Sequence, residues 1–465
     1  MLTYNFVNIG SDSLYMYLYK CIKKDIKEGR LKAQEKLPSK RALSKNLGIS
    51  VITVENAYSQ LIAEGYIYSL PKKGFYVSDL KDSAVEKIEE NFDNLNLSHE
   101  EKKYMADFTS NQTDSEAFPF SIWAKTMREV MNDKQTQLMI NAPCGGIMVL
   151  RKEISEYLKE FRGMKVNPEQ IIIGAGTEYL YTLIIQLLDK KTVYGVENPG
   201  YKKIAKVYGS MNVPYEHIDI DNLGVPVEAL EEKNIDVMHI SPSHHFPTGI
   251  VMPISRRYEL LGWASKKKGR FIIEDDYDSE LRLLGKPIPT LQSIDVSGKV
   301  IYMNTFTKTL CSTVRISYMV LPEELSYKFY KKLSFYSCTV SNFEQYTLAK
   351  FLQNGCFEKH INRLRKYYQN KRDKILKSLN KAPIREFITI TEEEAGVHFL
   401  MNINSKKSED EIVKEAEDKG IKLVPLSEYY CGSEEKFLNT YVMNYSSIDT
   451  QNISKIVSAL YEVVC

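Results

Sequence analysis

Short apolar runs that alternate with helical segments constrain the fold of this chain more than any other feature of its sequence. From about residue 105 onward the runs are rich in Ile, Val, Phe and Tyr, and helical patterns separate them. Parallel strands joined by helices produce this alternation, because each crossover lays a helix over one face of the sheet. The pattern predicts an α/β fold with a mostly parallel sheet, whose strands include residues 171–173, 193–196, 237–240, 271–273 and 300–303.

The first 78 residues carry a different pattern, that of three short helices and a hairpin. Apolar residues at positions 14, 18, 22 and 26 predict an amphipathic helix that ends near Gly29. Short β-like runs at 66–68 and 75–77 flank the turn residues 71–74, which predicts a hairpin wing. A small unit of three helices and one hairpin therefore precedes the α/β part.

A helix-turn-helix pattern lies between that first helix and the wing. Ser39 is a favourable N-cap for a second helix that stops at Gly48, and Ser50 is one for a third helix that ends at Gly65. Recognition helices place polar side chains against base edges while cations hold phosphates. The candidate DNA-binding residues are Ser39, Arg41, Ser50, Thr53, Asn56, Lys72 and Lys73.

The amino-acid sequence of this segment distinguishes a DNA-binding domain from an ordinary three-helix subdomain with a charged surface. The run L-P-S-K-R-A-L-S-K-N-L-G-I-S-V-I-T-V-E-N-A-Y-S-Q-L-I-A-E-G-Y-I resembles the GntR-type winged-helix family over roughly residues 13–77. That resemblance implies binding to double-stranded operator DNA. Two departures stand out, because Val51 follows Ser50 where family members usually have Arg, and the wing has the single glycine Gly74.

Charge distribution and composition agree with a multidomain chain. Residues 1–78 hold 12 Lys+Arg against 6 Asp+Glu, whereas residues 79–104 hold 4 against 8 and lack a steady apolar period, which predicts an acidic linker over 79–104. Seven cysteines without a C-x-x-C pair indicate reduced thiols and no zinc site, and no metal site is expected at His244 and His245. Without a signal peptide or an apolar run of membrane-spanning length, we expect a soluble, cytoplasmic protein with no membrane contact.

Residues that suit pyridoxal phosphate follow the predicted strands in a consistent order. This cofactor needs an amine for a Schiff base and a carboxylate for its pyridine nitrogen. Lys308 follows one strand, and the run I-E-D-D-Y at 273–277 ends another, where it offers a carboxylate for the ring nitrogen and a phenol for the ring oxygen. The G-A-G-T-E run at 174–178 opens a helix whose N–H groups suit a phosphate, and Arg315 suits the same phosphate.

This order resembles the fold-type I aminotransferases and, more narrowly, the MocR/GabR subfamily of GntR-type regulators. The resemblance implies large and small transferase-like domains over residues 105–465, after the winged helix at 1–78, and a head-to-tail homodimer. Matching stretches include S-P-S-H-H-F-P-T-G (241–249), I-E-D-D-Y-D-S-E-L-R (273–282) and T-F-T-K-T-L (305–310). By this resemblance Lys308 is the catalytic lysine that forms the Schiff base. The resemblance also implies that the cofactor is held by Lys308, Asp275, Tyr277, Tyr201, Gly176, Thr177, Thr305 and Arg315.

Departures from the aminotransferases bear on activity. Phe246 stands where those enzymes carry Asn, and Val442 stands where they carry the Arg that holds the substrate carboxylate. No Arg follows Arg385, so the bidentate carboxylate contact is missing. We therefore expect a transcription regulator whose transferase-like domain senses a ligand, either an amine or amino acid or the cofactor itself. The alternatives are a working aminotransferase that carries a DNA-binding domain, and a dimerisation domain that has lost the cofactor.

Overall fold

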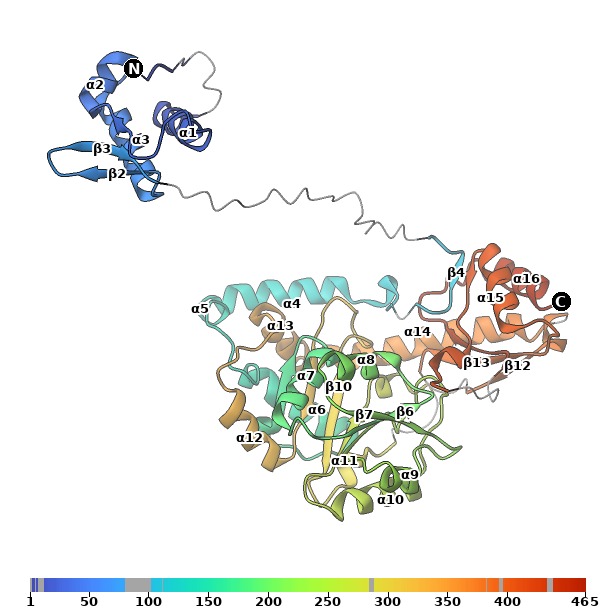
Figure 1. Ribbon diagram of the computed structural model, residues 1–465. Coiled ribbons are helices and arrows are strands. Elements are labelled where there is room, and N and C mark those ends of the chain that lie inside the picture. Colours follow the sequence, from blue (N-terminus) through green and yellow to red (C-terminus); the bar gives the residue numbers. More distant parts are fainter. Residues whose placement is uncertain are drawn as a thin grey trace. The chain divides into compact units, whose positions relative to one another are not determined.

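The computed structural model divides the chain into two compact units, Met1–Glu101 and Lys102–Cys465 (Figure 1). It describes residues 2–4, 6, 12–79, 102–110, 112–283, 288–381, 383–392, 396–432 and 438–465. Most of the predicted linker, residues 80–101, lies outside the described residues.

Three helices form the body of the first unit: α1 (Leu14–Lys27), α2 (Lys40–Leu47) and α3 (Val51–Ala63). The stripe on α1 is buried from Leu18 onward, whereas Leu14 at its start is 43% exposed. Ser39 caps α2 by accepting a hydrogen bond from the Ala42 N–H, and Ser50 caps α3 in the same way from the Thr53 N–H. The turn between these two helices passes through Gly48, whose φ of 66° favours glycine.

The wing is an antiparallel sheet with one strand more than the sequence predicted. Strands β2 (Ile67–Leu70) and β3 (Gly74–Val77) form the hairpin, and β1 (Lys36–Leu37) pairs with the outer side of β3. Buried residues of all three helices and of the hairpin make one small core, which includes Leu18, Ile22, Leu43, Val54, Tyr58, Leu61, Ile67 and Val77.

A seven-stranded sheet in the order β5-β11-β10-β9-β8-β6-β7 organises the larger unit. The five strands from β10 to β7 run parallel to one another, and β11 pairs antiparallel with both β10 and β5. The strands are β5 (Ile171–Gly174), β6 (Tyr194–Asn198), β7 (Tyr215–Asp219), β8 (Val237–Ile240), β9 (Phe271–Asp275), β10 (Val300–Thr305) and β11 (Ser317–Val320).

Helices cover both faces of this sheet, which explains why its strands read as continuous apolar runs. On one face Ile301 and Met303 pack with α7 (Thr177–Leu187), α8 (Lys202–Ser210) and α12 (Glu323–Leu333). On the other face Val300 and Tyr302 pack with helices in two further clusters. The helices that contribute there are α4 (Phe120–Asp133), α6 (Met148–Arg162), α9 (Val227–Glu232), α10 (Ile254–Ser265), α11 (Leu291–Ile294) and α13 (Asn342–Gln353), with the short α5 (Gln135–Leu138) following α4.

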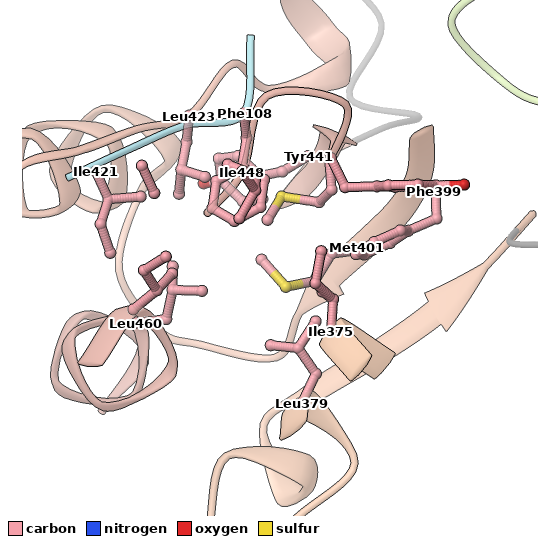
Figure 2. Packing of buried hydrophobic residues seen from close by; sticks show 14 of the residues in the cluster. Phe108, Ile375, Leu379, Phe399, Met401, Ile421, Leu423, Tyr441, Ile448 and Leu460 are labelled. Carbon is pink, nitrogen blue, oxygen red and sulfur yellow. The ribbon is translucent and has the colours of Figure 1, made fainter. Parts of the chain in front are cut away.

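The C-terminal part forms a second core of its own, drawn in orange and red in Figure 1 and seen closely in Figure 2. Phe399 and Met401 of its central strand point into a cluster that also holds Leu460 and Phe108 (Figure 2). The long helix α14 (Cys356–Leu379) joins both cores, because its first turns pack against the large sheet and its last turns against this cluster. The other elements are β12 (Ile388–Thr391), β13 (His398–Ile403), β15 (Thr440–Asn444), α15 (Glu409–Asp418), α16 (Ile453–Val464), and the pair β4 (Ala106–Asp107) and β14 (Ile421–Lys422).

In the described part of the chain, no helix combines the length and the apolar character needed to cross a membrane.

Candidate functional site

A cavity of about 200 Å³ opens where the carboxyl ends of β9 and β10 meet. The parallel register places Asp275 beside Met303, so the last residues of both strands reach the same edge of the sheet. Seven of the eight predicted cofactor residues line this cavity, namely Lys308, Asp275, Tyr277, Tyr201, Thr177, Thr305 and Arg315.

Lys308 lies in the turn that follows β10, and its amine is removed from bulk water. Burial lowers the pKa of this amine to about 8, against the opposing effect of the nearby Asp278 carboxylate. At mildly alkaline pH a substantial fraction of the amine is therefore uncharged. An uncharged amine is the form that attacks a carbonyl carbon.

Asp275 lines this cavity, and one of its two carboxylate oxygens has no hydrogen-bond partner. One of its carboxylate oxygens accepts a 2.7 Å hydrogen bond from the Tyr181 hydroxyl and lies 3.7 Å from Nε2 of His239. The other, Oδ1, is buried and has no hydrogen-bond partner. A buried carboxylate oxygen without a donor is costly, so a ligand that donates a proton there would be stabilised.

Strand alternation separates Asp275 from its two acidic neighbours. Glu274 and Asp276 point to the other side of β9, where Glu274 accepts backbone hydrogen bonds from Leu291 and Gln292. Burial raises the pKa of Glu274 to about 7. Of these three consecutive carboxylates, Asp275 is the one that lines the cavity.

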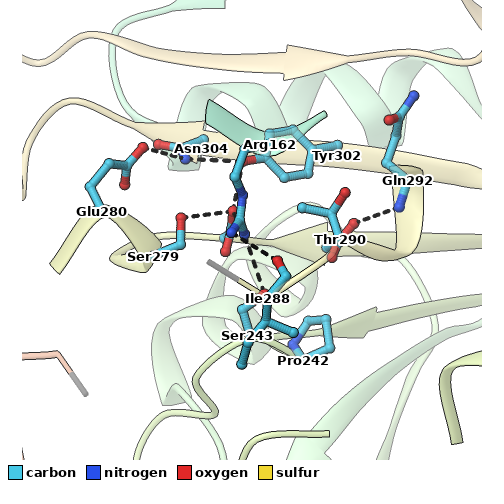
Figure 3. A network of polar contacts seen from close by, with 12 residues as sticks. Arg162, Pro242, Ser243, Ser279, Glu280, Ile288, Thr290, Gln292, Tyr302 and Asn304 are labelled. Carbon is cyan, nitrogen blue, oxygen red and sulfur yellow. Dashed lines mark hydrogen bonds and ion pairs between the residues drawn. The ribbon is translucent and has the colours of Figure 1, made fainter. Parts of the chain in front are cut away.

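A buried polar network supports this edge of the sheet from behind (Figure 3). Arg162 of α6 pairs with Asp276, which also accepts hydrogen bonds from Tyr302 at 2.7 Å and Ser279 at 2.9 Å. Arg162 also donates to the backbone carbonyl of Ile288 (Figure 3). All three contacts reach Oδ2 of Asp276, whereas its Oδ1 is buried without a partner. The network holds the end of β9 in place, and Asp276 does not line the cavity.

Tyr277 follows β9 and belongs to a chain of polar contacts. Its hydroxyl lies 3.2 Å from Nδ1 of His244, and that nitrogen lies 2.7 Å from Asp278. Burial raises the pKa of the Tyr277 phenol well above its usual value, so the phenol remains a hydrogen-bond donor. Near it, His398 of β13 lines the cavity with a buried Nε2 that has no partner.

The opposite end of the cavity is cationic and lies at the start of α7. Gly176, the eighth predicted cofactor residue, does not line the cavity itself but precedes Thr177 with a φ of 97°. A Cβ at Gly176 would lie 2.4 Å from Nη2 of Arg315, so only glycine lets the guanidinium approach this turn. Glu178 pairs with Arg315 at 2.7 Å and also with Lys203, and both cations lower its pKa.

Val442, the residue that the resemblance places at the position of the carboxylate-binding Arg, lies in an apolar cluster. Val442 of β15 is buried in a cluster with Leu400 and Leu426, and Phe246 and Tyr429 pack against it. Phe246 also stands edge-on to Tyr201, with ring centroids 5.9 Å apart. The cations that line the cavity among the described residues are Lys203, Lys308 and Arg315, whereas Lys422 lies outside it, 3.8 Å from Asp107.

Sequence reasoning missed several residues of the cavity. Lys203, Asp278, Ser312, His398 and Asn444 all line it. Lys203 and His398 stand outside any strand-end motif, and only the docking of α8 and β13 against the sheet brings them to the site. Among the described residues, no group of three or more His, Cys, Asp or Glu side chains is arranged to hold a metal ion.

The predicted DNA-binding residues occupy the surface of the first unit. Arg41, Asn56, Lys72 and Lys73 are exposed. The hydroxyls of the other three take part in capping: Ser39 and Ser50 accept the helix N–H groups described above, and the half-buried Thr53 hydroxyl lies 2.8 Å from that of Ser50.

Comparisons with known proteins cover both units. The gntR family of bacterial regulatory proteins matches residues 14–77, and the class I and II aminotransferases match residues 103–460. The HTH-type transcriptional regulator YdeL of Bacillus subtilis is 39% identical over 90% of each chain. The probable rhizopine catabolism regulatory protein MocR of Rhizobium meliloti is 28% identical over 96% of this chain and 93% of its own.

A solved aminotransferase resembles the larger unit. The kynurenine aminotransferase of Pyrococcus horikoshii, crystallised with PMP, superposes with a TM-score of 0.67 at 26% identity, over 78% of this chain and 91% of its own. Taken with the two family matches, this likeness shows a GntR winged helix followed in the sequence by a fold-type I transferase domain. The chain belongs to the MocR/GabR type of GntR-family transcription regulators.

Proposed function

We propose that this regulator holds pyridoxal phosphate covalently on Lys308 and changes its grip on operator DNA when the ligand state of the cavity changes. The observation that carries the proposal is that Asp275, whose Oδ1 is buried and unpartnered, lines the same cavity as Lys308. A protonated pyridine nitrogen supplies the donor that this oxygen lacks. The orphaned oxygen and the lowered pKa of Lys308 both suit the same cofactor.

The other proposed residues contact different parts of the cofactor. Tyr277 would donate to the ring oxygen, and Tyr201 would lie against the ring. Gly176, Thr177, Thr305 and Arg315 would hold the phosphate, with the N–H groups at the start of α7 adding to the charge of the guanidinium. Bound pyridoxal phosphate supplies an aldehyde and an electron-withdrawing ring, and the protein's side chains orient both.

The effector is either an amine or amino acid that displaces Lys308, or the cofactor itself. The cluster around Val442 favours the cofactor, because an α-carboxylate would meet apolar side chains there instead of an arginine. The same cluster disfavours a working aminotransferase as the main function. A purely structural dimerisation domain is disfavoured by the set of polar residues that converge on the cavity.

The partner of the first unit is operator DNA, which we propose the regulator binds as a head-to-tail homodimer. Arg41, Lys72 and Lys73 would replace counterions on phosphates, so binding should weaken steeply with salt. Titration of a promoter fragment at several salt concentrations tests this part, and an affinity that is independent of salt would contradict it.

Trapping with borohydride tests the cofactor part. Purified protein should absorb in the visible range, and reduction should bleach that band and leave the cofactor covalently attached to the peptide that contains Lys308. Lys308→Ala should lose both signals, whereas Lys422→Ala, a matched change outside the cavity, should keep them. Reducible covalent cofactor in the Lys308→Ala protein would overturn the assignment.

A further inference from the structure

The first turn of the recognition helix α3 exposes two large aliphatic side chains. Val51 is 41% exposed and Ile52 is 69% exposed, although both immediately follow the N-cap. The opposite face of the same helix is buried in the core of the unit through Val54, Tyr58 and Leu61. Packing of the first unit therefore does not account for the aliphatic pair.

Charge around this pair favours a polyanion as its partner. Residues 1–78 carry twice as many Lys+Arg (12) as Asp+Glu (6), and Arg41 at the start of α2 is exposed. Glu55, one turn after Val51, is paired with Lys40 at 2.5 Å, so this carboxylate repels a phosphate less than a free one would. An aliphatic spot among cations suits duplex DNA better than another apolar protein surface.

We propose that Val51 and Ile52 read thymine by packing against its C5-methyl group in the major groove. This inference rests on the DNA-binding part of the proposed function. Residues at the start of a recognition helix reach base edges, and among the four bases only thymine presents a methyl group in that groove. Neither Val nor Ile can make the bidentate hydrogen bonds by which an Arg at position 51 would select guanine.

The size of the effect follows from the area of one methyl group. Burying it against an aliphatic side chain should strengthen binding about fourfold for each contacted thymine. Because a dimer presents two recognition helices, a symmetric operator should contain at least one such thymine in each half-site.

The experiment compares thymine with uracil, which differs only by that methyl group. The full-length protein first selects its preferred duplexes from a random-sequence pool. Those duplexes are then synthesised with single dT→dU replacements, and their affinities are measured at one salt concentration. We expect at least one replacement in each half-site to weaken binding about fourfold, and the protein carrying both Val51→Ala and Ile52→Ala to bind the two forms equally.

Ile62→Ala is the matched control, since Ile62 is an exposed aliphatic residue in the last turn of the same helix. It should keep the thymine preference. Equal binding of dT and dU duplexes by the unaltered protein would overturn the inference while the DNA-binding function stands. The inference would also be overturned if the double variant still preferred dT over dU duplexes. This holds whether or not ultracentrifugation shows an altered oligomeric state. Failure to select any duplex would overturn both proposals.

Discussion

At the scale of single residues, the cavity changes the chemistry of ordinary side chains through burial and charge. Lys308 loses solvation, and its pKa falls to about 8. Burial also raises the pKa of Glu197, which lines a separate cavity together with Tyr201, to about 8. The two groups favour their neutral forms for the same reason, which is the cost of a charge away from water.

Attachment of pyridoxal phosphate to the cofactor-free protein should accelerate as pH rises, with a midpoint about pH 8. The sign follows because the neutral amine reacts and the lowered pKa places its deprotonation in this range. Asp278→Asn should move the midpoint to lower pH, since the Asp278 carboxylate raises the pKa of Lys308. Stopped-flow absorbance measures both midpoints. A midpoint above pH 10 in the unaltered protein would show a solvated amine.

Glu178 neutralises Arg315, which we expect to hold the phosphate, and the neighbouring Lys203. Its carboxylate pairs with Arg315 and Lys203. Glu178→Gln should therefore tighten pyridoxal phosphate binding roughly fivefold, given the modest worth of half-exposed ion pairs. Pyridoxal, which lacks the phosphate, should bind equally to both proteins.

Glu231→Gln is the control for that change, because it alters a carboxylate that pairs with Arg270 away from the cavity. It should leave both affinities as they are. Equal tightening of pyridoxal and pyridoxal phosphate by Glu178→Gln would show that the carboxylate does not act on the phosphate end.

At the scale of elements, the ends of strands and helices carry the site. β9 and β10 end beside each other, and α7 begins next to them with its unpaired N–H groups. Only backbone geometry at these ends allows the side chains to converge. Gly176 shows this dependence clearly, since it combines a φ of 97° with the guanidinium of Arg315 lying against it.

Gly176→Ala should weaken pyridoxal phosphate binding about tenfold or more, because the added methyl group displaces Arg315 and strains the turn. Gly163→Ala is the matched control. Gly163 also has a positive φ, 67°, but a Cβ there meets nothing within 4 Å. The Gly163→Ala protein should lose some thermal stability and keep its affinity for the cofactor. Cofactor titrations and thermal melts of both variants separate the two effects, and equal cofactor affinities would contradict the role of Gly176.

At the scale of the whole molecule, a domain with the aminotransferase fold follows a DNA-binding unit along the chain. The large sheet and the small C-terminal core both match the solved enzyme. One departure from the enzymes that the sequence predicts is Val442, which is buried with Leu400 and Leu426 in an apolar cluster behind Phe246 of the cavity wall.

Turnover of α-amino acids should be slow as a result. The loss of one bidentate charged contact in a desolvated site costs about 2–5 kcal/mol, which corresponds to tens to thousands of fold in rate. We expect steady-state transamination well below about 1 per second with a panel of amino acids and a keto-acid acceptor. Val442→Arg alone should not restore it, since Phe246 and Leu426 occupy the neighbouring space. Turnover at ordinary enzymatic rates would show that another group holds the carboxylate.

The sequence by itself predicted the local elements and seven of the nineteen residues that line the cavity. Helix caps such as Ser39 and Ser50, and strand-end positions such as Lys308 and Asp275, depend on neighbours in the chain, so patterns over a few residues predict them. The tertiary structure alone decided which groups meet across long separations: Lys203 with Glu178, His398 with the cavity, and Val442 with Phe246. It also left Oδ1 of Asp275 without a partner. Such contacts depend on how helices and sheets pack, and packing joins residues that no local pattern connects.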